Sequence, residues 1–275
     1  MSGDLPLLDL PADRPRSARL SNQGACCVLE LPLALSQELV ALSRRRGVTL
    51  FMTLLAAWAI QLARRSGREE MIIGMTIANR NLHETEGLIG FFVNTLPLRI
   101  DLSQATTFPE LLDQMRDVAL GAFTHQDVPL EKLVEEIQPK RYRDGSPLFQ
   151  VTFGIQNAPR EEIEIPGVES LPGPGAGREM ARFDLTIWVT ESPSGLSVAW
   201  TYRTDLFEQA TILTMHQSFE TLLGSIVEHP EAEIDSLETR TAAEQRAELR
   251  QNQARTESKR GKLMAVRPRA VKVAE

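Results

Sequence analysis

The stretch Gly87-Leu-Ile-Gly-Phe-Phe-Val-Asn-Thr-Leu-Pro-Leu-Arg99 decides how the rest of the chain is interpreted. Its two glycines tolerate tight or left-handed backbone, which predicts a turn at its start. Phe91–Leu98 is apolar and rich in β-forming residues, the pattern of a strand buried on both faces. Asn94 and Thr95 interrupt this run. A buried polar group without a hydrogen bond costs about 1–3 kcal/mol, so these side chains either brace a neighbouring loop or face a cavity.

The composition is that of a soluble globular protein. The chain has 275 residues, 42% hydrophobic and 24% charged, enough for one large domain or two small ones. A net charge of −7 argues against a nucleic-acid partner. No apolar run approaches the ~20 residues of a membrane helix, and no secretion signal is evident, so we expect a cytoplasmic protein without a membrane partner. The adjacent Cys26 and Cys27 fit no metal or redox spacing and are expected as reduced thiols.

Periodicity predicts an α/β fold, a mixed β-sheet flanked by helices. Helices are expected at 37–46 with Ser36 as N-cap, and at 50–65, 106–125, 129–138 and 208–228. Strands are expected at 25–31, 71–77, 91–98, 148–155, 181–190 and 196–202. The expected organisation is an extended lead-in at 1–24, a folded unit at 25–240, and a helical then basic linker or tail at 241–275.

No catalytic constellation is evident from the residues alone. The four histidines, His83, His125, His216 and His229, have no metal-binding spacing, and no metal is expected. His216 lies on an apolar helix face, which indicates a packed core histidine. The run His125-Gln126-Asp127 marks a helix end. It is either a polar cluster facing a cleft or a capping arrangement in which Asp127 accepts N–H groups of the next helix, and the spacing favours capping.

Several stretches in order resemble one family. Ile89–Arg99, His125–Glu131 and Arg143–Gln150 resemble the fifth, sixth and seventh core motifs of condensation domains of nonribosomal peptide synthetases, the last in a shorter form. Gly74–Arg80, Phe183–Thr186 and Tyr202–Phe207 also look like that family. The resemblance covers about Leu10 to Leu249.

The resemblance implies a chloramphenicol-acetyltransferase-like fold in which two lobes enclose a tunnel. Peptidyl or acyl carrier proteins bring substrates on phosphopantetheine from both mouths, and no cofactor binds directly. The acceptor amine attacks the donor thioester and forms an amide. The implied partners are these carrier proteins, the adjacent synthetase modules and an N-terminal condensation lobe.

One departure limits what can be carried over. The family's catalytic motif is His-His-x-x-x-Asp-Gly in the N-terminal lobe, and this chain has no His-His pair. The resemblance therefore implies the C-terminal lobe of a condensation domain, inactive alone, with no catalytic residue of its own. Residues 158–178 either cross to the other lobe or form a plain surface loop.

The residues that match the family's motifs are expected to line the tunnel or to support its structure. The motifs place Asn94 and Thr95 at the tunnel, His125, Gln126 and Asp127 at the helix end beside it, and Arg143 and Asp144 in the turn before the next strand. The remaining motif positions are expected to be structural: Gly90, Phe92, Arg99, Pro129, Phe149, Phe183 and Asp184.

Two other functions remain open. A free-standing acyltransferase would use His125 as general base, provided that it reaches the acceptor amine. A non-catalytic module would recruit carrier proteins or tailoring enzymes, with the basic tail from Lys259 either contacting an acidic surface or serving as a solvated linker.

Overall fold

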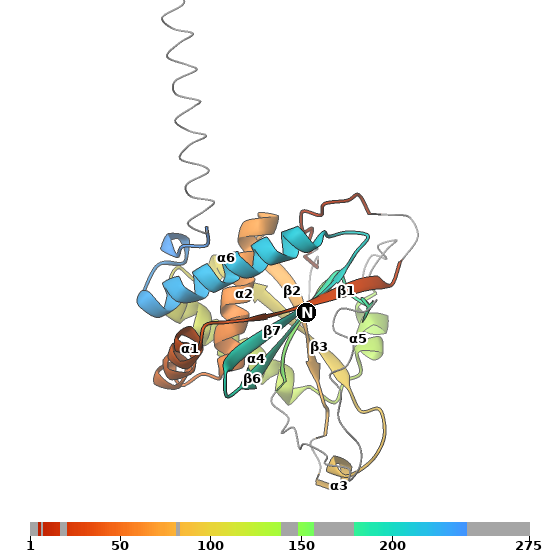
Figure 1. Ribbon diagram of the computed structural model, residues 1–275. Helices are drawn as coiled ribbons and strands as arrows, with labels where there is room; N and C mark the ends of the chain where they lie inside the picture. Colours follow the sequence, from red (N-terminus) through yellow and green to blue (C-terminus); the bar gives the residue numbers. More distant parts are fainter. Residues whose placement is uncertain are drawn as a thin grey trace, which may run out of the picture.

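The computed structural model describes residues 5–6, 8–16, 21–80, 83–138, 148–156 and 179–240, which form a sheet with helices packed against it (Figure 1). The strands are β1 (Gln23–Glu30), β2 (Glu70–Ile77), β3 (Asn94–Asp101), β4 (Val151–Gln156), β5 (Glu179–Met180), β6 (Leu185–Ser192) and β7 (Gly195–Arg203). The helices are α1 (Leu33–Arg46), α2 (Leu50–Ser66), α3 (His83–Glu86), α4 (Phe108–Thr124), α5 (Leu130–Ile137) and α6 (Gln209–Glu228), with short 3₁₀ turns at Leu102–Gln104 and Ile234–Ser236.

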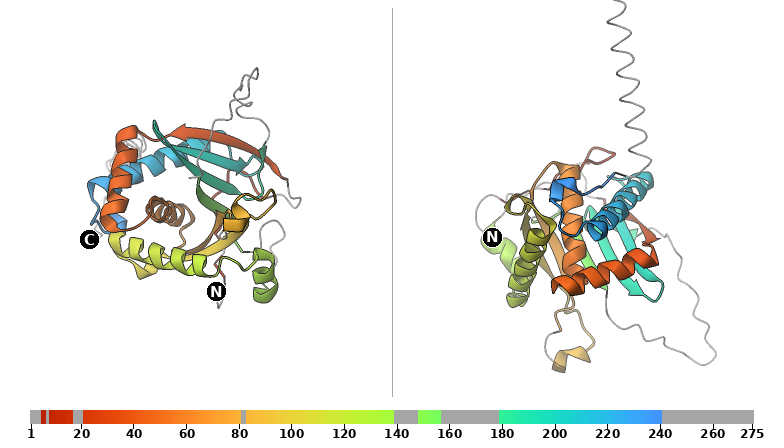
Figure 2. Two further views of the ribbon diagram at one scale, coloured as in Figure 1. Left: turned by 90° about the horizontal axis from the view of Figure 1, so that it is seen from below. Right: turned by 90° about the vertical axis from the view of Figure 1, so that its left-hand side faces the viewer.

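The sheet is mixed, as predicted. Its strand order is β3-β2-β4-β6-β7-β1-β5, and β4 runs parallel to both β2 and β6 while the other neighbours are antiparallel. Helices α1, α2, α4 and α6 gather on one side of the sheet (Figure 2). The main core lies between these helices and the sheet.

Helix α2 is the centre of that core. Thr49 caps its first turn by accepting a hydrogen bond from the N–H of Met52, and Gly67 ends it in the left-handed region at φ 66°. Trp58 is fully buried and meets Trp200 and Phe219 edge-on, with ring centroids 5.5 and 5.9 Å apart. The expected central helix is therefore confirmed. No single helix in the described ranges is long and apolar enough to span a bilayer; α1 and α2 together would be, but they meet at 106°.

The strand predicted at 91–98 is misplaced and is not buried on both faces. β3 begins at Asn94 and lies at the edge of the sheet with alternating burial, whereas the side chain of Phe91 is 85% exposed. Pro97 fits this edge position because proline has no N–H to donate to a second neighbour. The apolar run instead supplies an outward-facing loop.

Two other local predictions are wrong. Helix α1 begins at Leu33, so Ser36 lies inside its first turn and does not cap it. The Ser36 hydroxyl donates to the carbonyl of Pro32 at 3.1 Å and accepts from the N–H of Leu196 at 3.0 Å, which joins α1 to β7. The strand expected from residue 181 begins only at Leu185.

The described part of the lead-in packs against the folded unit. Leu8 and Leu10 are buried in the main core. The Asp13 carboxylate accepts hydrogen bonds from the Glu208 N–H at 2.7 Å and from the Thr211 hydroxyl at 2.8 Å, at the start of α6. The expectations for residues 158–178 and 241–275 fall outside the described residues.

Candidate functional site

A pocket of about 480 Å³ opens where β3 begins, between the loop before it, the start of α5 and the residues before β6. Six of the predicted site and motif residues line it: Phe92, Asn94, Thr95, Asp127, Pro129 and Phe183. The six lining residues not predicted are Asn79, Phe91, Val93, Leu130, Glu131 and Arg182. The pocket therefore combines aromatic walls with one amide-bearing strand end, two carboxylates and one guanidinium group.

Asn94 joins β3 to the loop between α4 and α5. Its Nδ2 donates to the carbonyl oxygens of Gln126 and Val128 at 2.9 and 2.8 Å. Its Oδ1 accepts from the N–H groups of Thr95 and Leu130 at 2.9 and 3.3 Å. All four hydrogen-bonding positions of the amide are used, so Asn94 braces a neighbouring loop and lines the pocket at once.

The His125–Asp127 run lies beside the pocket, and only Asp127 lines it. His125 ends α4, where its N–H donates to the carbonyl of Ala122 at 3.1 Å, and its side chain is exposed. The N–H of Leu130 at the start of α5 is bonded by Asn94 and not by Asp127, so the expected capping role of Asp127 is wrong. Pro129 is the N-cap residue of α5, without a side-chain capping bond.

The loop between β2 and β3 is organised by Arg80. Its guanidinium donates to the carbonyl oxygens of Thr85, Leu88 (2.8 Å) and Gly90 (3.3 Å). It also lies 4.4 Å from the ring centroid of Phe92, a cation–π contact. The predicted structural positions Gly90 and Phe92 are thus both contacted by Arg80, and Phe92 lines the pocket.

A second apolar cluster, formed by Ile72, Leu148 and Phe149, packs against the pocket residue Phe183. Phe149 is fully buried, and its ring centroid lies 5.4 Å from that of Phe183. A Cβ on Gly74 of β2 would fall 2.4 Å from the Phe149 ring, so only glycine leaves room for it. Side chains of α5, among them Leu130 and Leu133, pack against this cluster.

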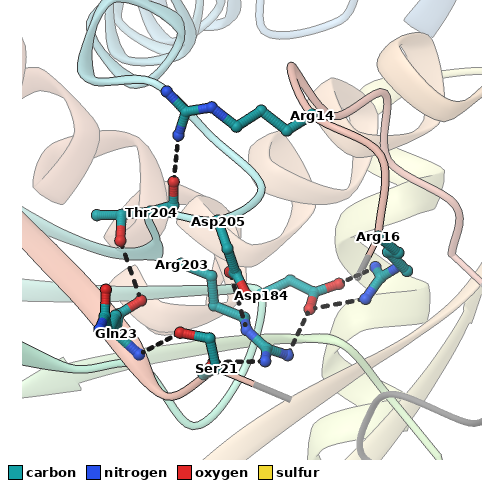
Figure 3. Close-up of polar contacts among 8 residues, drawn as sticks. All are labelled: Arg14, Arg16, Ser21, Gln23, Asp184, Arg203, Thr204 and Asp205. Carbon is teal, nitrogen blue, oxygen red and sulfur yellow. Dashed lines mark hydrogen bonds and ion pairs between the residues drawn. The ribbon is translucent and has the colours of Figure 1, made fainter. Parts of the chain in front are cut away.

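Two other predicted structural positions, Arg99 and Asp184, do not line the pocket. Arg99, near the far end of β3, pairs with Glu70 at 2.5 Å. Asp184 is buried in a charged network with Arg16 and Arg203 (Figure 3). Arg143 and Asp144 lie outside the described residues.

The histidines give the pocket no general base. None of them lines it. His216 is buried in the core as predicted, and its Nδ1 accepts from the indole N–H of Trp200 at 3.2 Å. Burial lowers the pKa of His216. Among the described residues, no three His, Cys, Asp or Glu side chains are grouped as a metal site would require. Among the described residues that line the pocket, the ionisable side chains are Asp127, Glu131 and Arg182.

Of the six unpredicted lining residues, all but Arg182 lie in stretches that resemble family motifs, but no signal distinguished them from their neighbours there. Asn79 has a positive φ of 54°, which marks a special turn, but asparagine in a polar run carries no such information by itself. Glu131 is the last residue of the motif-like stretch His125–Glu131, and Arg182 directly precedes the stretch Phe183–Thr186, but neither residue was predicted as a site residue.

The fold and the pocket define the class of protein, an α/β domain of the chloramphenicol-acetyltransferase-like type. A four-domain nonribosomal peptide synthetase, holo-AB3403 with bound AMP and glycine, contains this fold, with a TM-score of 0.76 and 23% identity over 87% of this chain and 19% of that one. The X-domain of teicoplanin biosynthesis in complex with OxyB is similar at a TM-score of 0.77 and 27% identity, over 86% of this chain and 52% of that one.

The family follows from the sequence comparisons. The condensation domain family model matches residues 1–249, and the chain belongs to the condensation domain family. One of the linear gramicidin synthase proteins of Brevibacillus parabrevis is 46% identical over 233 residues, 84% of this chain. The chain spans only 3% of the length of that synthase. Malpinin synthetase of Mortierella alpina is 45% identical over 212 residues, which are 77% of this chain and 3% of the synthetase.

Proposed function

We propose that this chain is the C-terminal lobe of a nonribosomal peptide synthetase condensation domain and that its pocket forms part of one tunnel wall. There, the amine of a carrier-bound acceptor attacks the thioester of a carrier-bound donor in the cytoplasm. The proposal rests on how much of a solved domain of this fold the chain covers. The chain covers about half of a solved domain of this fold, 52%, and its sequence has no His-His pair.

The reaction requires an amine that has lost its proton. The amine nitrogen bonds to the thioester carbonyl carbon, the thiolate leaves, and the proton of the nitrogen passes to a base. His125, the nearest histidine in sequence to the pocket residues, is exposed at the end of α4 and does not line the pocket. We therefore assign the chain a positioning role, with the base supplied by an N-terminal lobe, in the same chain or as a separate one.

An apolar loop supports the need for a second lobe. Leu88 is 53% exposed, Ile89 is fully exposed, and Phe91, which lines the pocket, is 85% exposed. The contacts of Arg80 hold this loop in a defined shape. A defined group of large apolar side chains at the surface marks an interaction site.

The test is a carrier-protein assay read by mass spectrometry. The purified chain is incubated with a donor-loaded and an acceptor-loaded carrier protein, alone and with a separately supplied N-terminal lobe. We expect amide-linked product only with both lobes, and less of it for Phe91→Ser than for a matched change of an exposed leucine on α6, Leu213→Ser. Product from the chain alone, lost in His125→Ala, would establish the free-standing acyltransferase instead.

A second candidate is a recruitment module. The teicoplanin X-domain, 27% identical to this chain, was solved in complex with OxyB. In this case a carrier protein or tailoring enzyme would bind without any amide formation by the two lobes. Binding measured with and without residues 256–275 separates a docking role of the basic tail from a linker role: unchanged affinity after the deletion excludes docking by the tail.

A further inference from the structure

Charged side chains meet where the segment before β1 crosses the ends of β6 and β7 (Figure 3). Asp184 lies directly before β6, and Arg203 is the last residue of β7. Their side chains are 3% and 5% exposed, whereas Arg16, from the segment before β1, is 33% exposed. A carboxylate this deeply buried is tolerated only when its oxygens are hydrogen-bonded.

Within the described residues, the hydrogen bonds to the Asp184 carboxylate come from Arg16. The two guanidinium nitrogens of Arg16 donate to the two carboxylate oxygens, Nη1 to Oδ1 at 3.1 Å and Nη2 to Oδ2. Arg203 contributes charge but no hydrogen bond, since its Nη1 is 3.6 Å from Oδ1. The Nη2 of Arg203 donates instead to the carbonyl of Ser21 at 2.5 Å. Arg16 is thus the partner on which the carboxylate depends.

Asp184 is joined directly to the pocket wall. Arg182 and Phe183, the two residues before it, both line the pocket. The Asp184 N–H donates to the carbonyl of Gln150 at 2.9 Å, so the same residue also ties this wall to the start of β4. If Arg16 withdraws, the carboxylate loses its hydrogen bonds and has to turn toward water or toward Arg203. Either movement shifts the turn that carries Phe183.

We propose that Arg16 is a positioning residue for the pocket. Through Asp184 it fixes Arg182 and Phe183 in the pocket wall. A displacement of the segment before β1 should therefore shift these two residues as well. This coupling is independent of whether the chain takes part in amide formation. A conformational change in the segment before β1 could therefore alter the shape of the pocket through Arg16 and Asp184.

Hydrogen–deuterium exchange of the full chain, resolved on short peptides, tests the coupling. Arg16→Ala is compared with Arg14→Ala, a matched control in the same segment. Arg14 binds the carbonyl of Thr204 and the carboxylate of Glu208 but does not contact Asp184. We expect Arg16→Ala to speed exchange in peptides covering 182–186 by at least about fivefold, the lower end of the range for leaving a buried acceptor without its partner. Arg14→Ala should leave these peptides unchanged.

Two further variants separate positioning from general loosening. In an Asp184→Asn background the buried charge is gone, so Arg16→Ala should add little to exchange at 182–186. If Arg16→Ala does not fold, Arg16→Lys takes its place, with a smaller rise expected because an ammonium group lacks the two parallel donors. Unchanged exchange at 182–186, or an equal rise in Arg14→Ala, would overturn the proposal.

Discussion

The amide of Asn94 offers the sharpest test of how the pocket is held. Asn94→Ala removes two donated and two accepted hydrogen bonds at the junction of β3, α4 and α5. A hydrogen bond in a protein is worth about 0.5–1.5 kcal/mol net, and the site is half-buried, so water replaces part of the loss. Taking the lower half of that range for four bonds, we expect a loss of about 2–4 kcal/mol in the free energy of unfolding.

Asn94→Asp is the informative partner variant. It keeps the size and the two accepted bonds but places a carboxylate oxygen against two carbonyl oxygens, at positions where Nδ2 now lies 2.8 and 2.9 Å from them. The repulsion should make Asp at least as destabilising as Ala at neutral pH. Protonation supplies one donor, so the deficit should shrink as the pH falls toward the pKa of the new carboxyl, about 4 or above.

Urea unfolding followed by circular dichroism measures both variants. Thr95→Val is the control, because the Thr95 side chain lines the same pocket and its hydroxyl makes no hydrogen bond with the described residues. In a thermal scan followed by the same signal, the Ala variant of a domain of this size should melt about 4–16 °C lower. Asn94→Ala with the stability of wild type, or Asn94→Asp milder than Asn94→Ala at pH 7, would refute the bracing role.

The remaining predictions concern the sheet, the core and a helix start. Gly74→Ala should cost about 1–3 kcal/mol, because its Cβ would lie 2.4 Å from the Phe149 ring; thermal melting tests this, and an unchanged melting temperature would contradict it. Burial lowers the pKa of His216, despite Glu220 Oε2 at 4.0 Å from its Nε2, so the unfolded state binds more protons than the folded state below the unfolded pKa of about 6.5. Stability should therefore fall as the pH drops below that value, and His216→Gln should flatten the profile measured by urea unfolding; an equally steep profile would exclude His216 as the cause. Thr107→Ala removes one side of a capping box with Glu110 and should cost about 1 kcal/mol by the same assay, whereas no loss would mean that the cap is not needed.

The ends of α2 and the start of α4 were predictable because their signals are local, although the N-cap expected for α1 at Ser36 was wrong. Thr49 and Gly67 mark the two ends of α2, and Thr107 marks the start of α4. Such signals act through nearby backbone groups, so the sequence carries them without knowledge of the fold. The same holds for the buried strand β2, whose continuous apolar run identifies it.

The pocket contacts were not predictable because they join distant residues. Asn94 bonds the loop 32–36 residues later, and Arg16 reaches Asp184 across 168 residues. The polar letters in the apolar run indicated two roles for Asn94, and the structure shows both. The apolar residues of the run led to the wrong prediction of a buried strand. Phe91 has a side chain typical of a core, but it is exposed in a loop that the Arg80 contacts hold in place.

The edge position of β3 has a consequence for handling the protein. An edge strand offers its backbone to strands of other molecules and so promotes aggregation. β3 carries Pro97 in its middle and the charged Arg99 and Asp101 at its end, features that natural edge strands use against such pairing. Replacing Pro97 by a β-branched residue would restore a full row of donors along that edge. We therefore expect Pro97 to limit pairing of β3 with strands of other molecules.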